Sequence, residues 1–332
     1  MTSQSPAPDR GRLRPAWTLV LLTVCCAELS FTAVAVPQTW LLLPLLLVMY
    51  GAGVLLIREA AVRVGAGWPS LVLLGVAYEL AEDGIGLQAL TSEKMYGAAD
   101  WGWRLGGANL TYWASQLGVH VVFSVLVPIL LIGMLFPAHR GRPFLRRGGL
   151  VLVGALAVLG VVGLRLVISS QLDPGYRAPV PWIAAYVIGI VVLAWIALRV
   201  VPQVPAPTVT APAPRPALVG VASAAATFGF LLLTLPLALR PGSEPVLAAI
   251  APGPVAIVLA AAVALGIGWA ERRWSAMPTW IDLHQVWLVG GILLAHTAFM
   301  MPASPTAVVA GSVTLVVEVA LLMLLARRVG SS

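Results

Sequence analysis

The chain has 332 residues, of which 60% are hydrophobic and only 10% are charged. Soluble domains carry about 25% charged residues, so this composition excludes a soluble globular protein of this length. The formal net charge of +7 would suggest a nucleic-acid partner in a soluble protein. Here the basic residues sort to one side of the predicted membrane helices, so we expect no nucleic-acid partner, and the predicted partner is the lipid bilayer.

Apolar runs of about 20 residues recur along the chain and predict an all-α, polytopic transmembrane helical bundle of about ten spans. The run that ends at Ala33–Ala35 resembles the end of a signal peptide. It is long for a signal peptide and contains Glu28, so we expect it to be the first span. We place the spans at residues 16–36, 40–57, 69–90, 112–135, 149–169, 181–201, 217–239, 246–270, 286–301 and 306–326.

Basic residues are distributed unevenly between the two sides of these spans. The expected outer segments hold Lys94, Arg104, Arg177 and Arg240, and Arg165 lies within a span. The other fifteen of the twenty basic residues fall on the inner side. Because cytoplasmic loops are enriched in Lys and Arg, the pattern predicts that both termini are cytoplasmic. We therefore expect a multi-pass protein of the plasma membrane, of the bacterial cytoplasmic type.

A proline-rich stretch, residues 202–216, divides the chain and predicts an extended cytoplasmic linker. On this basis the chain has five parts. They are a cytoplasmic N-terminal tail (1–15), a six-span unit that holds the polar cluster (16–201), the linker (202–216), a four-span unit (217–326) and a cytoplasmic C-terminal tail (327–332).

The third span carries three carboxyl groups, Glu79, Glu82 and Asp83, in the sequence YELAEDGIG. A charged side chain at the centre of a bilayer costs about 2.5–3.5 kcal/mol on insertion scales, so such residues face the interior of a bundle. The three acids lie on one helical stripe with Gly75 and Gly86. The spacing therefore predicts that they point inward together.

The fourth span has a polar stripe of its own, which contains Asn109, Gln116 and His120. With a rise of 1.5 Å per residue, Glu28, Glu82, Asp83 and His120 lie about 10–12 Å below the outer ends of their spans. We therefore predict an outward-facing intramembrane pocket for a small polar or cationic solute or for protons. The acids would be the acceptors and His120 the relay.

Three further polar residues lie within or near the ends of spans and are secondary candidates. Glu318 is typical of an interhelical hydrogen bond, and His296 is typical of an interfacial residue near a helix end. Arg165 is long enough to extend its guanidinium outward to the membrane surface, or to pair with one of the acids.

Motifs for cofactor chemistry are not found in the sequence, which contains no H-E-x-x-H zinc motif, P-loop, Rossmann fingerprint or nucleophile elbow. We predict no metal site and identify no cofactor and no protein partner. The transporter-like interpretation is favoured over an enzyme. Two other classes remain open: an intramembrane hydrolase or lipid-linked transferase, with or without a metal, and a membrane scaffold or partner subunit.

Overall fold

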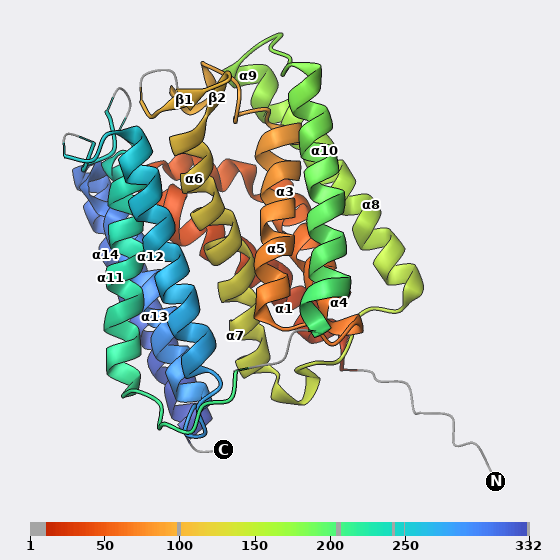
Figure 1. Ribbon diagram of the computed structural model, residues 1–332, viewed down its shortest axis with the longest axis vertical. Helices are drawn as coiled ribbons and strands as arrows, with labels where there is room; N and C mark the ends of the chain where they lie inside the picture. The colour runs from red at the N-terminus through yellow and green to blue at the C-terminus, as the bar shows by residue number, and fades with distance from the viewer. Residues whose placement is uncertain (1–10, 98–100, 204–206, 241–242, 249, 331–332) are drawn as a thin grey trace.

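The computed structural model describes residues 11–97, 101–203, 207–240, 243–248 and 250–330, and it is a helical bundle (Figure 1). In this part of the chain, nine helices are long and apolar enough to cross a membrane. A further helix, α5 (Trp68–Glu79), continues directly into the π-helix η4 (Leu80–Gly86), and together they carry the three acids. The predicted polytopic helical bundle of about ten spans is therefore confirmed.

The first six spans contain π-helical stretches as well as α-helix. Their segments are α1 (Leu13–Val24), η1 (Cys25–Thr32), α2 (Ala33–Ala35), η2 (Pro37–Leu42), α3 (Leu43–Leu46), η3 (Leu47–Gly51), α4 (Ala52–Arg63), α5, η4, α6 (Leu110–Gly118), η6 (Val119–Leu126), α7 (Val127–Leu135), α8 (Arg147–Gly163), η8 (Leu164–Ser169), α9 (Ser170–Leu172), α10 (Val180–Trp195) and η9 (Ile196–Val200).

The last four spans are simple α-helices, and the remaining elements are short. The spans are α11 (Pro216–Thr234), α12 (Gly253–Trp274), α13 (Asp282–Met300) and α14 (Pro305–Gly330). The short elements are the 3-10 turns η5 (Met95–Gly97), η7 (Pro137–His139), η10 (Val201–Gln203), η11 (Leu237–Leu239) and η12 (Met301–Ala303), and the strands β1 (Arg104–Leu105) and β2 (Ala108–Asn109).

Two predicted boundaries differ from the structure because of prolines. The seventh span ends at Thr234 rather than at 239, since Leu235 is extended and Pro236 follows it. The eighth begins at Gly253 rather than at 246, because Pro252 and Pro254 start the helix. Apolar composition alone had extended both spans into the connecting loop.

The first residue of α1 and the last turn of α14 lie at the same end of the bundle, as an even number of crossings requires (Figure 1). The loop after α4 and the loop from α7 to α8 are at this end, and the hairpin of β1 and β2 is at the other. The tail at 1–10, linker residues 204–206 and residues 331–332 lie outside the described residues. The described part of the linker reaches the loop before α13, where the Ala213 amide donates to Thr279 at 2.7 Å.

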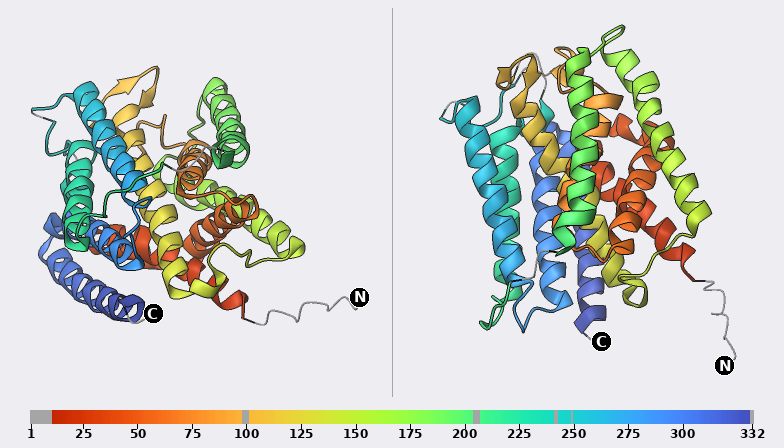
Figure 2. Two further views of the ribbon diagram at one scale, coloured as in Figure 1. Left: turned by 60° about the horizontal axis from the view of Figure 1, so that its bottom comes forward. Right: turned by 45° about the vertical axis from the view of Figure 1, so that its right-hand side comes forward.

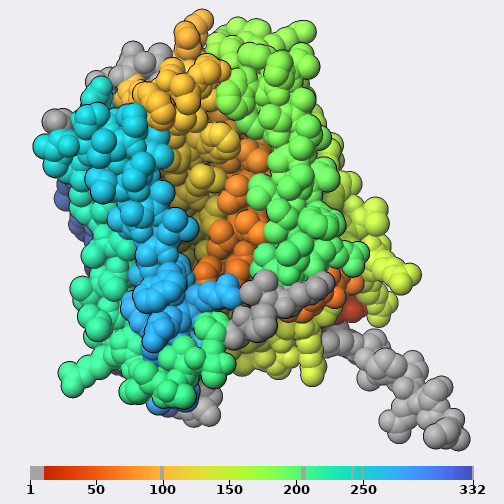
Figure 3. Space-filling view, in the orientation of Figure 1, coloured from red at the N-terminus to blue at the C-terminus, as the bar shows by residue number. Residues whose placement is uncertain are grey.

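The interior of the bundle is built around α5 and η4. Helices α4, α10 and η6 pack against α5, and α10 also covers η4. Figure 2 shows α11 to α14 together on one side of the bundle and α8 and α10 on the other. In the space-filling view a vertical furrow between α10 and α12 has α5 and α6 as its floor (Figure 3). Glu79, Glu82 and Asp83 are buried, so they do not line this furrow.

Candidate functional site

The candidate site lies where π-helical stretches of the first four spans meet. Glu28 lies in η1, Tyr50 in η3, Glu82 and Asp83 in η4, and His120 in η6. π-Helices are rare and occur frequently at functional sites, because the extra residue in each turn changes the direction of the side chains. Four such segments surround one group of polar residues, and this identifies the region as the candidate functional site.

His120 lies between two carboxyl groups at the centre of the site. Its Nδ1 is 3.2 Å from Oε2 of Glu82, and its Nε2 is 3.3 Å from Oδ2 of Asp83. The three side chains are between 1% and 5% exposed. A neutral imidazole carries one N–H and can donate to one carboxylate only, whereas an imidazolium can donate to both. The geometry therefore suits a histidine that carries a proton between two acids.

Aromatic residues with polar groups complete the surroundings of the acids. The Tyr112 hydroxyl donates to Oδ1 of Asp83 at 3.2 Å, and the Trp113 indole N–H donates to Oε2 of Glu79 at 3.1 Å. The Tyr50 hydroxyl donates to Oε1 of Glu28 at 2.7 Å. The ring of Tyr50 also lies 5.9 Å, centroid to centroid, from that of His120, so Glu28 is joined to the central group through this tyrosine.

The site is enclosed at its outer end by the segment between η4 and α6. Met95 and Trp101 in this segment are buried, and the Trp101 ring meets the edge of Tyr112 at 5.9 Å. Two outer cavities of about 500 and 350 Å³ are lined by other residues and by none of the site's acids. This differs from the outward-open pocket expected from sequence: the chain turns back at Gln88, which has a φ of +57°, and covers the acids.

Two of the predicted residues have local roles instead. The side-chain oxygen of Asn109 accepts a hydrogen bond from the Tyr112 amide at 2.9 Å and caps α6, and its amide group donates to the Trp101 carbonyl at 2.9 Å. Asn109 therefore positions two residues that enclose the site. Gln116 is half-buried and donates to the Ser115 hydroxyl at 3.2 Å.

Arg165 extends its side chain toward the outer end of the bundle. The guanidinium donates to the Ser169 hydroxyl at 2.6 Å and to the Tyr176 carbonyl. These two hydrogen bonds go to residues around α9 and not to the acids of the site.

His296 and Glu318 lie together in a second buried cluster. The Thr297 hydroxyl is 3.1 Å from Oε1 of Glu318, and His296 is completely buried and contacts η1. His296 therefore lies inside the bundle and not on its surface. The residue is near the C-terminal end of α13, as its position in the sequence indicates. Rings from η1 and η6 pack against it, and the sequence of α13 alone does not predict these contacts.

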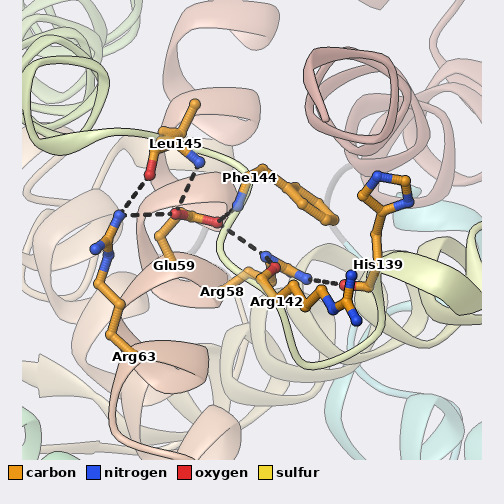
Figure 4. Close-up of polar contacts among 7 residues, drawn as sticks. All are labelled: Arg58, Glu59, Arg63, His139, Arg142, Phe144 and Leu145. Carbon is orange, nitrogen blue, oxygen red and sulfur yellow. Dashed lines mark hydrogen bonds and ion pairs between the residues drawn. The ribbon is translucent and has the colours of Figure 1, made fainter. Parts of the chain in front are cut away.

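A third buried charged group, at the inner end of the bundle, has its polar groups satisfied by protein partners (Figure 4). The Glu59 carboxylate accepts from Arg58 at 2.9 Å, from Arg63 at 3.3 Å, and from the amides of Phe144 and Leu145 at 2.7 and 3.1 Å. Arg58 also donates to the carbonyls of Arg142 and His139. This cluster ties the end of α4 to the loop between α7 and α8, and we assign it a structural role.

Sequence reasoning missed the tyrosines that contact the site, Tyr50, Tyr78 and Tyr112. A signal was present, because Tyr50 lies deep within a predicted span rather than at its end, where tyrosines gather in membrane proteins. Among the described residues, no three His, Cys, Asp or Glu side chains are arranged to hold a metal ion. What the arrangement supports is the binding and exchange of protons.

No curated protein and no solved structure matches the sequence. A protein-family model, described as an uncharacterized membrane protein family, matches residues 18–331, which include all ten helical spans except the first turn of α1. The chain belongs to this uncharacterized membrane protein family.

Proposed function

We propose that this protein is a transporter-like membrane protein in which Glu82, His120 and Asp83 bind protons, coupled to the movement of a small polar or cationic solute. The observation that carries the proposal is the placement of one buried histidine between two buried carboxyl groups, 3.2 and 3.3 Å away. Ionisable residues at this depth are rare in membrane proteins and mark ion paths and proton relays.

The surroundings favour protons as the species bound at this centre. The acids accept from hydroxyl and indole donors, and the group is enclosed by packed aromatic rings. Glu79 has one buried carboxyl oxygen with no hydrogen-bond partner among the described residues, so a proton on this group would not break an existing contact. A proton needs no cavity, whereas a solute needs the outer segment to open first.

The geometry gives less support to the enzyme interpretation. A general base needs a free nitrogen or oxygen that faces the substrate. The side chain of His120 is 5% exposed and lines neither of the two cavities described above, so neither of its ring nitrogens faces a cavity that could hold a substrate. The scaffold interpretation, in which the acids serve assembly only, is an outcome of the experiment below.

We further propose the orientation and organisation that the basic residues and the linker indicate. Both termini would be cytoplasmic, in a plasma membrane, with a six-span unit and a four-span unit joined by residues 202–216. The end of α4, which closes with Arg63, and the loop from α7 to α8 lie at the same end of the bundle as the last turn of α14. This loop and the first residue of α8 carry four arginines, whereas the hairpin of β1 and β2 at the other end carries Arg104 alone, which supports this orientation.

The test is the titration of the carboxyl groups in purified protein in lipid vesicles. Infrared difference spectra between about pH 5 and 9 would compare wild type with Glu82→Gln and Asp83→Asn. We expect a carboxyl band that changes with pH and is lost in both variants but not in Glu93→Gln, an exposed acid of the outer segment. Acids that never titrate would indicate a sealed structural network and would put the scaffold interpretation first.

Proton movement through the same vesicles tests the functional step. Under an imposed pH gradient, a trapped pH-sensitive dye should report proton flux in wild type and none in the double variant Glu82→Gln, Asp83→Asn. The double variant must keep the helical circular dichroism and monodisperse behaviour of the wild type. Full flux in a folded double variant would refute the proposal.

A further inference from the structure

The second buried cluster is built around His296 in α13, at the joint between the N-terminal and C-terminal halves of the bundle. The imidazole stacks on Phe31 of η1 with centroids 5.4 Å apart and meets the edge of Phe123 of η6 at 4.7 Å. The side chain has no exposed surface. The protonation state of this ring therefore depends on the polar protein groups that contact its two nitrogens.

Each ring nitrogen of His296 faces a backbone carbonyl oxygen. Nδ1 contacts the Leu293 carbonyl within the same helix, and Nε2 lies 3.1 Å from the Cys26 carbonyl of η1. A carbonyl oxygen only accepts hydrogen bonds, and a neutral imidazole has one N–H. An imidazolium donates to both carbonyls, so a second proton on the ring finds an acceptor already in place. In the neutral ring the nitrogen without a proton has a hydroxyl beside it, Oγ1 of Thr297 at Nδ1 or Oγ of Ser30 at Nε2.

A counter-charge for a protonated ring lies one hydroxyl group away. Oγ1 of Thr297 is 3.2 Å from Nδ1 of His296 and 3.1 Å from Oε1 of Glu318. On the other side, Oγ of Ser30 is 3.3 Å from Nε2. Glu318 on α14 is the titratable side chain linked to His296 through Thr297, and Cys26 on η1 contacts the ring through its backbone carbonyl. The stacked ring of η1 and the neighbouring ring of η6 are uncharged phenylalanines.

We propose that His296 is a second proton-binding site of this protein, with Glu318 as its counter-charge. It is separate from the group around His120, which is formed by the first four spans alone. Protonation gives the ring an N–H on both nitrogens, so Nε2 of α13 then donates to the Cys26 carbonyl of η1 whichever tautomer the neutral ring has. The same π-helix carries Glu28, whose partner Tyr50 lies against His120. Both sites therefore contact the same element, η1.

The experiment is solid-state NMR of protein labelled with ¹⁵N-histidine, in lipid vesicles, over a pH series. The chain has four histidines, and loss of a signal in His296→Gln assigns this one. If that variant does not fold, removal of the other three histidines one at a time assigns it by elimination. We expect both nitrogens of His296 to be protonated at low pH and one of them to lose its proton as the pH rises.

The variants separate this site from structural effects and from the proposed function. Glu318→Gln should lose the doubly protonated signal at a pH where wild type shows it, while Thr314→Val, one turn away on α14, should keep it. Glu82→Gln, which tests the proposed function, should leave the signal of His296 in place. A ring that stays singly protonated from about pH 5 to 9, or one that stays doubly protonated throughout, overturns the proposal.

Discussion

The buried Glu59 cluster gives the most direct test of the energetics of this fold, through the substitution Glu59→Ala. The side chain of Glu59 has no exposed surface and that of Arg58 is 4% exposed. The substitution removes an acceptor that four donors share and leaves the Arg58 guanidinium buried without its carboxylate. Breaking a buried ion pair in this way costs about 3–5 kcal/mol.

The matched control is Arg140→Ala, which breaks an ion pair at the same end of the bundle. Arg140 and Asp282 contact each other at 2.7 and 3.0 Å, but their side chains are 45% and 30% exposed. An exposed pair contributes about 0–1 kcal/mol, because water and salt screen it. We therefore expect the free energy of unfolding to fall several times further in Glu59→Ala than in Arg140→Ala.

Unfolding would be followed by circular dichroism in mixed micelles as the fraction of denaturing detergent rises. Hydrogen exchange adds a local readout, because the amides of Phe144 and Leu145 donate to Glu59 and should lose their protection in Glu59→Ala only. Equal free energies of unfolding in the two variants, with these amides still protected, would refute the reasoning.

Three further predictions follow from single contacts. A Cβ at Gly291 would overlap the backbone of α11, so Gly291→Ala should lower the melting temperature, whereas Gly229→Ala, with no atom within 4 Å, should not; tryptophan fluorescence measures both. Asn109→Ala removes a helix cap and should cost about 1 kcal/mol in the same detergent titration as above. Tyr50→Phe removes the donor to Glu28 and should cost about 1–3 kcal/mol, with a shifted Glu28 carboxyl band in the infrared spectrum.

Some features of the fold were predictable because they depend on short stretches of sequence. The length of each apolar run indicated the spans, and the helical period placed Glu79, Glu82 and Asp83 on one buried stripe. The rise per residue predicted that Glu28 and His120 lie at about the same depth as Glu82 and Asp83. In the structure His120 contacts two of them, and Tyr50 links Glu28 to this group.

Other features could not be predicted because they arise where two or more helices meet. The sequence analysis did not predict the π-helical turns. In η4 these turns place Glu82 and Asp83 beside the two ring nitrogens of His120. The burial of Trp101 is a second example. This residue follows the third span and packs against Tyr112, where it helps to enclose the acids.

The sequence by itself determined the class of protein, the helical spans and the inward facing of the acids, because these depend on hydrophobic length and helical period. Only the tertiary structure decided the partners of each polar group: His120 between two carboxyl groups, His296 between two carbonyls, and Glu59 among four donors. The physical reason is that a polar group in a membrane must find its partners on neighbouring helices. The spacing of residues along one helix does not determine which groups on the neighbouring helices become these partners.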